Sequence, residues 1–74
     1  MQSHRIIVSF VAPEHSGKTI LEAALAKILE SHGVKVLLPP DPQRDDKMAR
    51  PIEELLAAFH DKQAVVMFME SNAT

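Results

Sequence analysis

The chain has 74 residues, a formal net charge of −2 and no cysteine. A chain of this size forms at most one small domain and buries only about 60% of the surface that its unfolded form exposes. The acidic balance and the scatter of Lys and Arg argue against a nucleic-acid or anionic-membrane binder, since both need a clustered basic surface. No stretch approaches the roughly 20 apolar residues of a membrane span. We therefore expect one domain over residues 1–74 in the cytoplasm, where disulfides are not needed.

The first predicted element is a strand over residues 6–12, IIVSFVA. This run is β-branched, aromatic and nearly continuously apolar, which favours a strand that is covered on both faces. Pro13 and Gly17 follow, and both residue types interrupt regular structure. The sequence therefore predicts a strand that ends in a loop over residues 13–17.

A helical period begins at Lys18 and continues to about residue 32. Apolar residues recur there at spacings of three and four: Ile20, Leu21, Ala24, Leu25, Ile28 and Leu29. This spacing places them on one face of a helix. Gly33 then stands where a left-handed C-terminal cap is expected.

The sequence of the second half of the chain predicts two more strands, one before and one after a second helix. Residues 34–38 form an apolar strand that ends at Pro39-Pro40, and residues 39–47, PPDPQRDDK, are expected to form an exposed loop. Pro51 suits the first turn of a helix with an apolar stripe that consists of Ile52, Leu55, Leu56 and Phe59. Residues 61–63 form a turn, residues 64–69 form a third buried strand, and Glu70 closes it.

The order strand, helix, strand, helix, strand predicts an α/β fold. Strands that alternate with helices imply crossover connections and a parallel sheet. Right-handed crossovers then place one helix on each face of a three-stranded sheet.

The loop after the first predicted strand has the pattern Ala12-x-x-x-x-Gly17-Lys18-Thr19. Backbone amides over residues 14–19 can surround phosphate oxygens, and the start of the helix adds positive potential. Gly17 permits a close approach of the backbone, the Lys18 ammonium can reach terminal phosphates, and the Thr19 hydroxyl can bind Mg²⁺. The sequence thus predicts a phosphate-binding loop that includes Pro13, Glu14, His15, Ser16, Gly17, Lys18 and Thr19.

This motif resembles the Walker A loop of the P-loop NTPase superfamily, and the whole chain resembles the first βαβαβ portion of that fold. The layout is similar to small phage or bacterial P-loop proteins and to the front half of small-molecule kinases. The resemblance implies strand order 2-3-1, ATP or GTP with Mg²⁺, and an acidic residue that orients water. Glu70 stands at that last position, so Lys18 and Glu70 are the candidate catalytic residues. The sequence has no guanine signature, so the base is left open.

Each candidate has a structural alternative. Lys18 and Thr19 can be an exposed lysine and a capping threonine at a helix start, and His15 can be a solvated loop residue. Glu70 can be a polar strand terminator, and the acidic residues of the loop over 39–47 can be solvated. Arg44 and Arg50 are candidates for contact with phosphate charge across an oligomer interface.

Two functions follow from these patterns. The first is binding of a magnesium nucleoside triphosphate, with weak or partner-dependent phosphohydrolase or phosphotransferase activity through Lys18, Thr19 and Glu70. The second is a non-enzymatic interaction protein of the phage type that kept the fold and lost turnover. In either case we expect a homodimer through an exposed sheet edge, with a further protein partner as an option.

Overall fold

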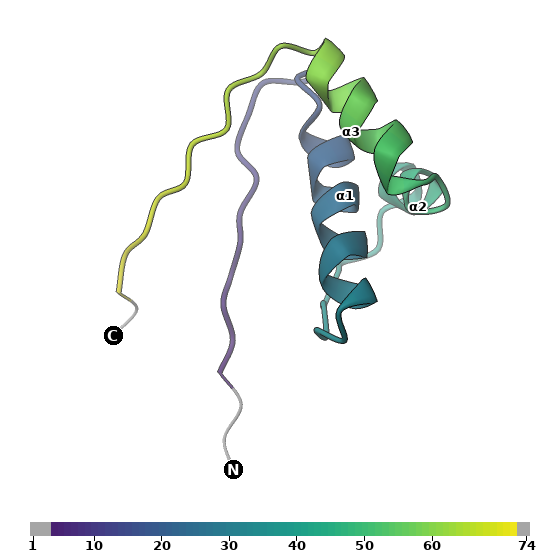
Figure 1. Cartoon of the computed structure of the whole chain (residues 1–74). Helices are drawn as coiled ribbons and strands as arrows, with labels where there is room; N and C mark the ends of the chain where they lie inside the picture. Colours follow the sequence, from purple (N-terminus) through teal and green to yellow (C-terminus); the bar gives the residue numbers. More distant parts are fainter. Residues whose placement is uncertain (1–3, 73–74) are drawn as a thin grey trace.

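The computed structural model describes residues 4–72 and contains three helices (Figure 1). Helix α1 spans Lys18–Ser31, α2 spans Pro42–Met48 and α3 spans Ile52–Asp61. Residues 4–12, before the loop that precedes α1, and residues 64–72, after the turn that ends α3, are extended and contain no β-strand (Figure 1). The architecture is therefore a helical unit with two extended arms, which we define as residues 4–12 and 64–72.

The predicted α/β fold is wrong. Residues 6–12, 34–38 and 64–69 are extended, but within the described residues they form no sheet, so neither the parallel sheet of order 2-3-1 nor a helix on each face exists. Strands need partners, and the two arms run apart instead of pairing (Figure 1). The sheet edge through which we expected a dimer is absent with the sheet.

The position of α3 explains why a parallel arrangement fails. Gly17, at the start of α1, lies against Phe59 and Lys62 at the end of α3, so the two helices run in opposite directions (Figure 1). One arm therefore enters this end of the unit and the other leaves it. Consecutive parallel strands would instead require the chain to return to the opposite end before the third strand.

Helix α2 is the element that the sequence reading missed, since residues 39–47 were expected to form a loop. The Asp41 carboxylate caps its first turn by accepting hydrogen bonds from the amides of Gln43 at 3.0 Å and Arg44 at 3.4 Å. Pro42 occupies the first turn, where a missing amide hydrogen has no cost to the helix. Lys47 lies in the last turn, where a cation is favourable. The prolines and aspartates thus start a helix here.

The predicted helix beginning at Lys18 is confirmed, together with its end. Gly33 has a φ of 81°, and its amide donates to the Glu30 carbonyl at 3.0 Å. The Val34 amide donates to the Leu29 carbonyl at 3.0 Å. These two bonds form a Schellman motif around a left-handed glycine, as expected for this position.

The core of the helical unit is small. Ala23 and Ala24 of α1 and Leu55 of α3 are buried together, and Ile20 and Met48 pack against them. The two alanines let α3 approach α1 closely. Leu29 and Leu56 belong to the predicted apolar faces of their helices, but each is 43% exposed. The reason is that no sheet covers the second side of either helix.

Candidate functional site

The phosphate-loop candidate forms a tight turn between the first arm and α1. His15 has a φ of 64° and Gly17 a φ of 95°, so two residues of this turn adopt left-handed backbone conformations. Such conformations suit glycine and cost other residues free energy. The loop is therefore sharply bent, not extended.

The first amides of α1 have no partner within the described chain. Gly17 precedes the helix and provides no side-chain cap. The Leu21 amide donates to the Gly17 carbonyl at 2.9 Å, but none of the hydrogen bonds among residues 4–72 uses the amides of residues 17–20. Helix starts with free amides and a positive dipole end attract anions.

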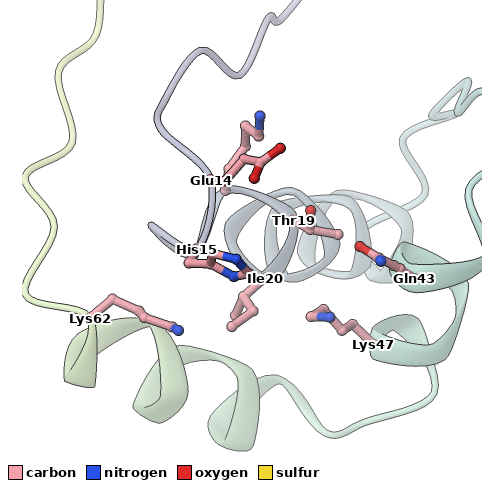
Figure 2. Close-up of a pocket in the computed structure, with 9 residues that line it drawn as sticks. Glu14, His15, Thr19, Ile20, Gln43, Lys47 and Lys62 are labelled. Atoms are coloured by element: carbon pink, nitrogen blue, oxygen red, sulfur yellow. The ribbon is translucent and has the colours of Figure 1, made fainter.

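A cleft of about 510 Å³ opens at this end of α1 (Figure 2). Residues of the loop, of α1 and of α2 line it, together with Lys62 just after α3: Glu14, His15, Gly17, Lys18, Thr19, Ile20, Gln43, Lys47 and Lys62. Figure 2 shows Lys62 and Lys47 reaching in from opposite sides, with Ile20 between them. The cleft therefore joins the sequence-predicted loop to α2 and to the end of α3.

The charge in the cleft is predominantly positive. Lys18, Lys47 and Lys62 line it, against the single carboxylate of Glu14. Within the described part of the chain, the ion pairs and side-chain hydrogen bonds include none of these three ammonium groups. The lysines are thus available to a ligand, and an anion fits this cleft better than a cation.

Five of the seven predicted loop residues line the cleft: Glu14, His15, Gly17, Lys18 and Thr19. Pro13 and Ser16 do not, although the Ser16 hydroxyl oxygen is buried and has no hydrogen-bond partner. Glu70, the candidate water-orienting carboxylate, lies on the exposed second arm and is not a lining residue. The structure therefore gathers most of the binding candidates but separates the two catalytic candidates, Lys18 and Glu70.

Gly17 has a packing role that the sequence did not reveal. A Cβ atom at this position would lie 2.9 Å from Cδ1 of Phe59 and 3.1 Å from Cγ of Lys62. A contact of 2.9 Å to an aromatic ring forces a neighbour to move. The absence of a side chain at Gly17 therefore lets α3 reach the loop and bring Lys62 to the cleft.

Gln43, Lys47 and Lys62 are cleft residues that the sequence reading missed. Gln43 and Lys47 were placed in a solvated loop, and Lys62 in a turn before a strand. The Asp41-Pro42 pair is a helix-start signal that could have revealed α2 and the direction of its first turn. No local pattern indicates that Lys62 lies beside Gly17, because that contact depends on the packing of α3.

Arg44 holds α2 against α1, and it does not line the cleft. Its guanidinium contacts the Glu22 carboxylate at 3.2 Å and the Asp45 carboxylate at 3.1 Å, and its side chain is only 4% exposed. Desolvation acts to lower the pKa of Arg44, but the hydrogen bonds and charges of Glu22 and Asp45 outweigh it and raise that pKa. Arg44 is thus committed to an internal ion pair. Arg50 pairs with Asp46 at 3.5 Å on the surface.

Magnesium fits this cleft only as a companion of phosphate. The hydroxyl of Thr19 and the carboxylate of Glu14 are lining oxygen groups, and Mg²⁺ prefers oxygen ligands. Among the residues that the structure describes, no cluster of three or more metal-binding side chains occurs. A magnesium ion at this cleft would therefore need phosphate oxygens and water to complete its coordination.

Comparison with known protein families, with curated proteins and with solved structures finds no match to this chain. No helix within residues 4–72 has the length and apolar character to cross a bilayer.

Proposed function

We propose that the cleft binds the phosphate groups of a nucleoside triphosphate, ATP or GTP, together with Mg²⁺. The observation that supports this most is the set of unpartnered amides over residues 17–20 at the mouth of a cleft that also contains Lys18. Amides, a helix start and an ammonium group together are what P-loop sites use to hold phosphate. A cytoplasmic location belongs to the same proposal.

Different groups of the cleft bind the phosphates and the metal ion in this proposal. The amides and the Lys18 ammonium bind phosphate oxygens, and the Thr19 hydroxyl holds Mg²⁺. The metal ion supplies charge neutralisation when it is bound. Glu14 is the one carboxylate on the cleft. Because Glu70 lies elsewhere, we propose that any phosphohydrolase or phosphotransferase activity is weak or depends on a partner that completes the site.

Calorimetry tests this proposal on the intact chain. ATP and GTP, each with Mg²⁺, are titrated into the wild-type protein and into Lys18→Gln, with Lys35→Gln as the matched control. Lys35 also carries one positive charge but lines a separate hollow with Arg5 and Leu37. We expect the Lys18 variant to lose binding and the Lys35 variant to keep it. No heat and no thermal shift at millimolar nucleotide with the wild type would eliminate the proposal.

A second candidate function, a non-enzymatic interaction protein, is favoured by the exposed arms. Ile6, Ile7 and Val11 of the first arm and Val65, Phe68 and Met69 of the second are all at least 85% exposed. Large apolar side chains that are almost fully exposed on two segments favour an interaction site. The backbone groups of the extended arms also lack partners of their own, which favours pairing with another chain.

The exposed surface area of the chain indicates how much surface a partner would cover. The chain exposes 6718 Å². A compact monomer of 8.2 kDa would expose about 4,500 Å². The excess is about 2,200 Å² per chain, which is within the range of permanent homodimers.

We propose a second copy of this chain as the occupant, since a symmetric pair is the commonest assembly and brings four arms together. Three or more strands with an apolar face are the minimum for a stable sheet in water. One chain supplies two arms, and a pair of chains supplies four.

Light scattering tests the pairing at micromolar concentration. We expect a mass near twice 8.2 kDa for the wild type and a fall to the monomer mass in Ile7→Glu/Phe68→Glu. A double variant on the helical unit, Leu29→Glu/Leu56→Glu, is the control for apolar residues that are only half exposed. A wild-type mass near one subunit would refute pairing between copies.

A further inference from the structure

We propose that Lys47 and Lys62 form a second pair of phosphate contacts, which makes the cleft selective for a chain of phosphates over a single phosphate. This inference rests on the proposed function and extends it to the class of ligand. Its evidence lies outside the loop motif, on α2 and at the end of α3.

The side chains of Lys47 and Lys62 both lie at the cleft. Lys47 lies in the last turn of α2 and Lys62 follows α3, and both line the same cleft as Lys18 (Figure 2). In Figure 2 their ammonium ends approach from opposite walls, with Ile20 between them and His15 nearby. Two cations held on opposite sides of one cleft suit an extended anion with several charges.

Without a ligand, this arrangement of lysines is electrostatically unfavourable. Like charges that face one cleft repel each other, and only Glu14 offsets Lys18, Lys47 and Lys62 among the lining side chains. None of the three lysines is engaged in an ion pair within the described chain. A polyanion relieves this repulsion in proportion to the number of phosphates that it carries.

The fold fixes the elements that carry both lysines. The stem of Lys62 passes over Gly17, where a Cβ would lie 3.1 Å from its Cγ. Helix α2, which carries Lys47, is held to α1 by the buried Arg44–Glu22 pair at 3.2 Å. The two lysines are therefore presented by packed elements, although the side-chain ends are free to adjust.

The size of the cleft agrees with a ligand longer than one phosphate. Its volume of about 510 Å³ is within the range of small-molecule sites, which span roughly 300–1,000 Å³. A single phosphate held at residues 17–20 would leave most of this volume to water. A triphosphate bound at the loop has charge left over to meet the lysines on the walls.

Titration with base-free probes tests the inference: inorganic phosphate, pyrophosphate and tripolyphosphate at low salt. The variants are Lys47→Gln and Lys62→Gln, with Lys35→Gln as the charge-matched control outside the cleft. We expect each cleft variant to weaken tripolyphosphate about fivefold, the effect of one solvated charge pair, and to leave inorganic phosphate within about twofold. Lys62→Arg retains the charge and should restore binding, and unchanged circular dichroism confirms folding.

The outcomes separate this inference from the proposed function. If Lys18→Gln abolishes binding while the two cleft variants behave like Lys35→Gln, the selectivity for polyphosphate is refuted and phosphate binding stands. If all three probes fail to bind the wild type, the proposed function itself fails. If the two variants weaken phosphate and tripolyphosphate equally, the lysines act only through net charge and the inference is also refuted.

Discussion

The helical unit and the arms of this chain share similar apolar residues but differ in what those residues contact. In the helical unit, Leu55 is 1% exposed and packs against Ala23 and Ala24. In the arms, Ile7 is 87% exposed and Val65 93% exposed. Hydrophobic character therefore buries a residue only where the chain provides a surface to pack against.

The overall dimensions reflect the same contrast. The radius of gyration is 13.3 Å, whereas a compact domain of 74 residues has about 11 Å. The arms account for the difference, because both leave one end of the three packed helices as extended chain (Figure 1). The cleft belongs to the helical unit, so its ligand chemistry is independent of the arms unless a partner chain comes close to it.

The largest expected effect is that of a core truncation in the helical unit. Leu55→Ala removes the largest side chain of the core and should lower the free energy of unfolding by about 2–5 kcal/mol. With so small a core, we expect loss of the thermal unfolding transition. Leu56→Ala is the matched control, since Leu56 is 43% exposed, and should cost less than about 1.5 kcal/mol. Equal effects of the two variants would contradict the packing of α3 on α1.

The junction of the loop with α3 gives the next largest effect. Gly17→Ala combines a left-handed backbone, which costs about 1–2 kcal/mol, with a 2.9 Å contact to Phe59. We expect a loss of about 2–4 kcal/mol in chemical denaturation.

Gly33→Ala separates the backbone cost of the Gly17 variant from the cost of its contact with Phe59. Gly33 has a φ of 81°, and a Cβ there would meet no atom within 4 Å. This variant should show the backbone cost alone, about 1–2 kcal/mol. A Gly17 variant as mild as the Gly33 variant would show that Phe59 does not close on the loop.

Local signals in the sequence predicted the first helix and its end, but they did not reveal α2. The helical period from Lys18 and the glycine cap at Gly33 were both predicted correctly. Asp41 and Pro42 carried a start signal for α2, but the surrounding prolines and charges favoured a loop reading. This error had a physical source: residues that begin helices are also the residues that form turns.

The sheet could not be judged from local signals, because an apolar run does not specify its partner. Residues 6–12 and 64–69 have the composition of buried strands, yet they have no ladder in this structure. The site shows the same division. The spacing of the loop motif singled out Lys18 and Thr19, which line the cleft, whereas Lys47 and Lys62 reach it only through the packing of α2 and α3.

A smaller effect is expected at the cap of α2. Asp41→Ala removes the acceptor of two amide hydrogen bonds, at 3.0 and 3.4 Å, and should cost about 1 kcal/mol. Asp46→Ala is the control, since its carboxylate makes only an exposed contact to Arg50 at 3.5 Å, worth about 0.3–0.5 kcal/mol. Denaturant titration measures both. If Asp46 proved as costly as Asp41, the cap would not be what begins α2.

The smallest effect on the helical unit should come from the first arm, and it depends on protein concentration. At a concentration too low for pairing, Ile7→Glu changes a side chain that packs on nothing and should alter stability by less than about 0.5 kcal/mol. At high concentration, the wild type gains stability from association, because a partner that binds only the folded state shifts unfolding by mass action. The variant should lose this gain, so its melting temperature should stay constant while that of the wild type rises with concentration. Parallel thermal scans at two concentrations measure the difference. A large loss already at low concentration would place the first arm in the same cooperative unit as Leu55, and the contrast between the two regions would no longer hold.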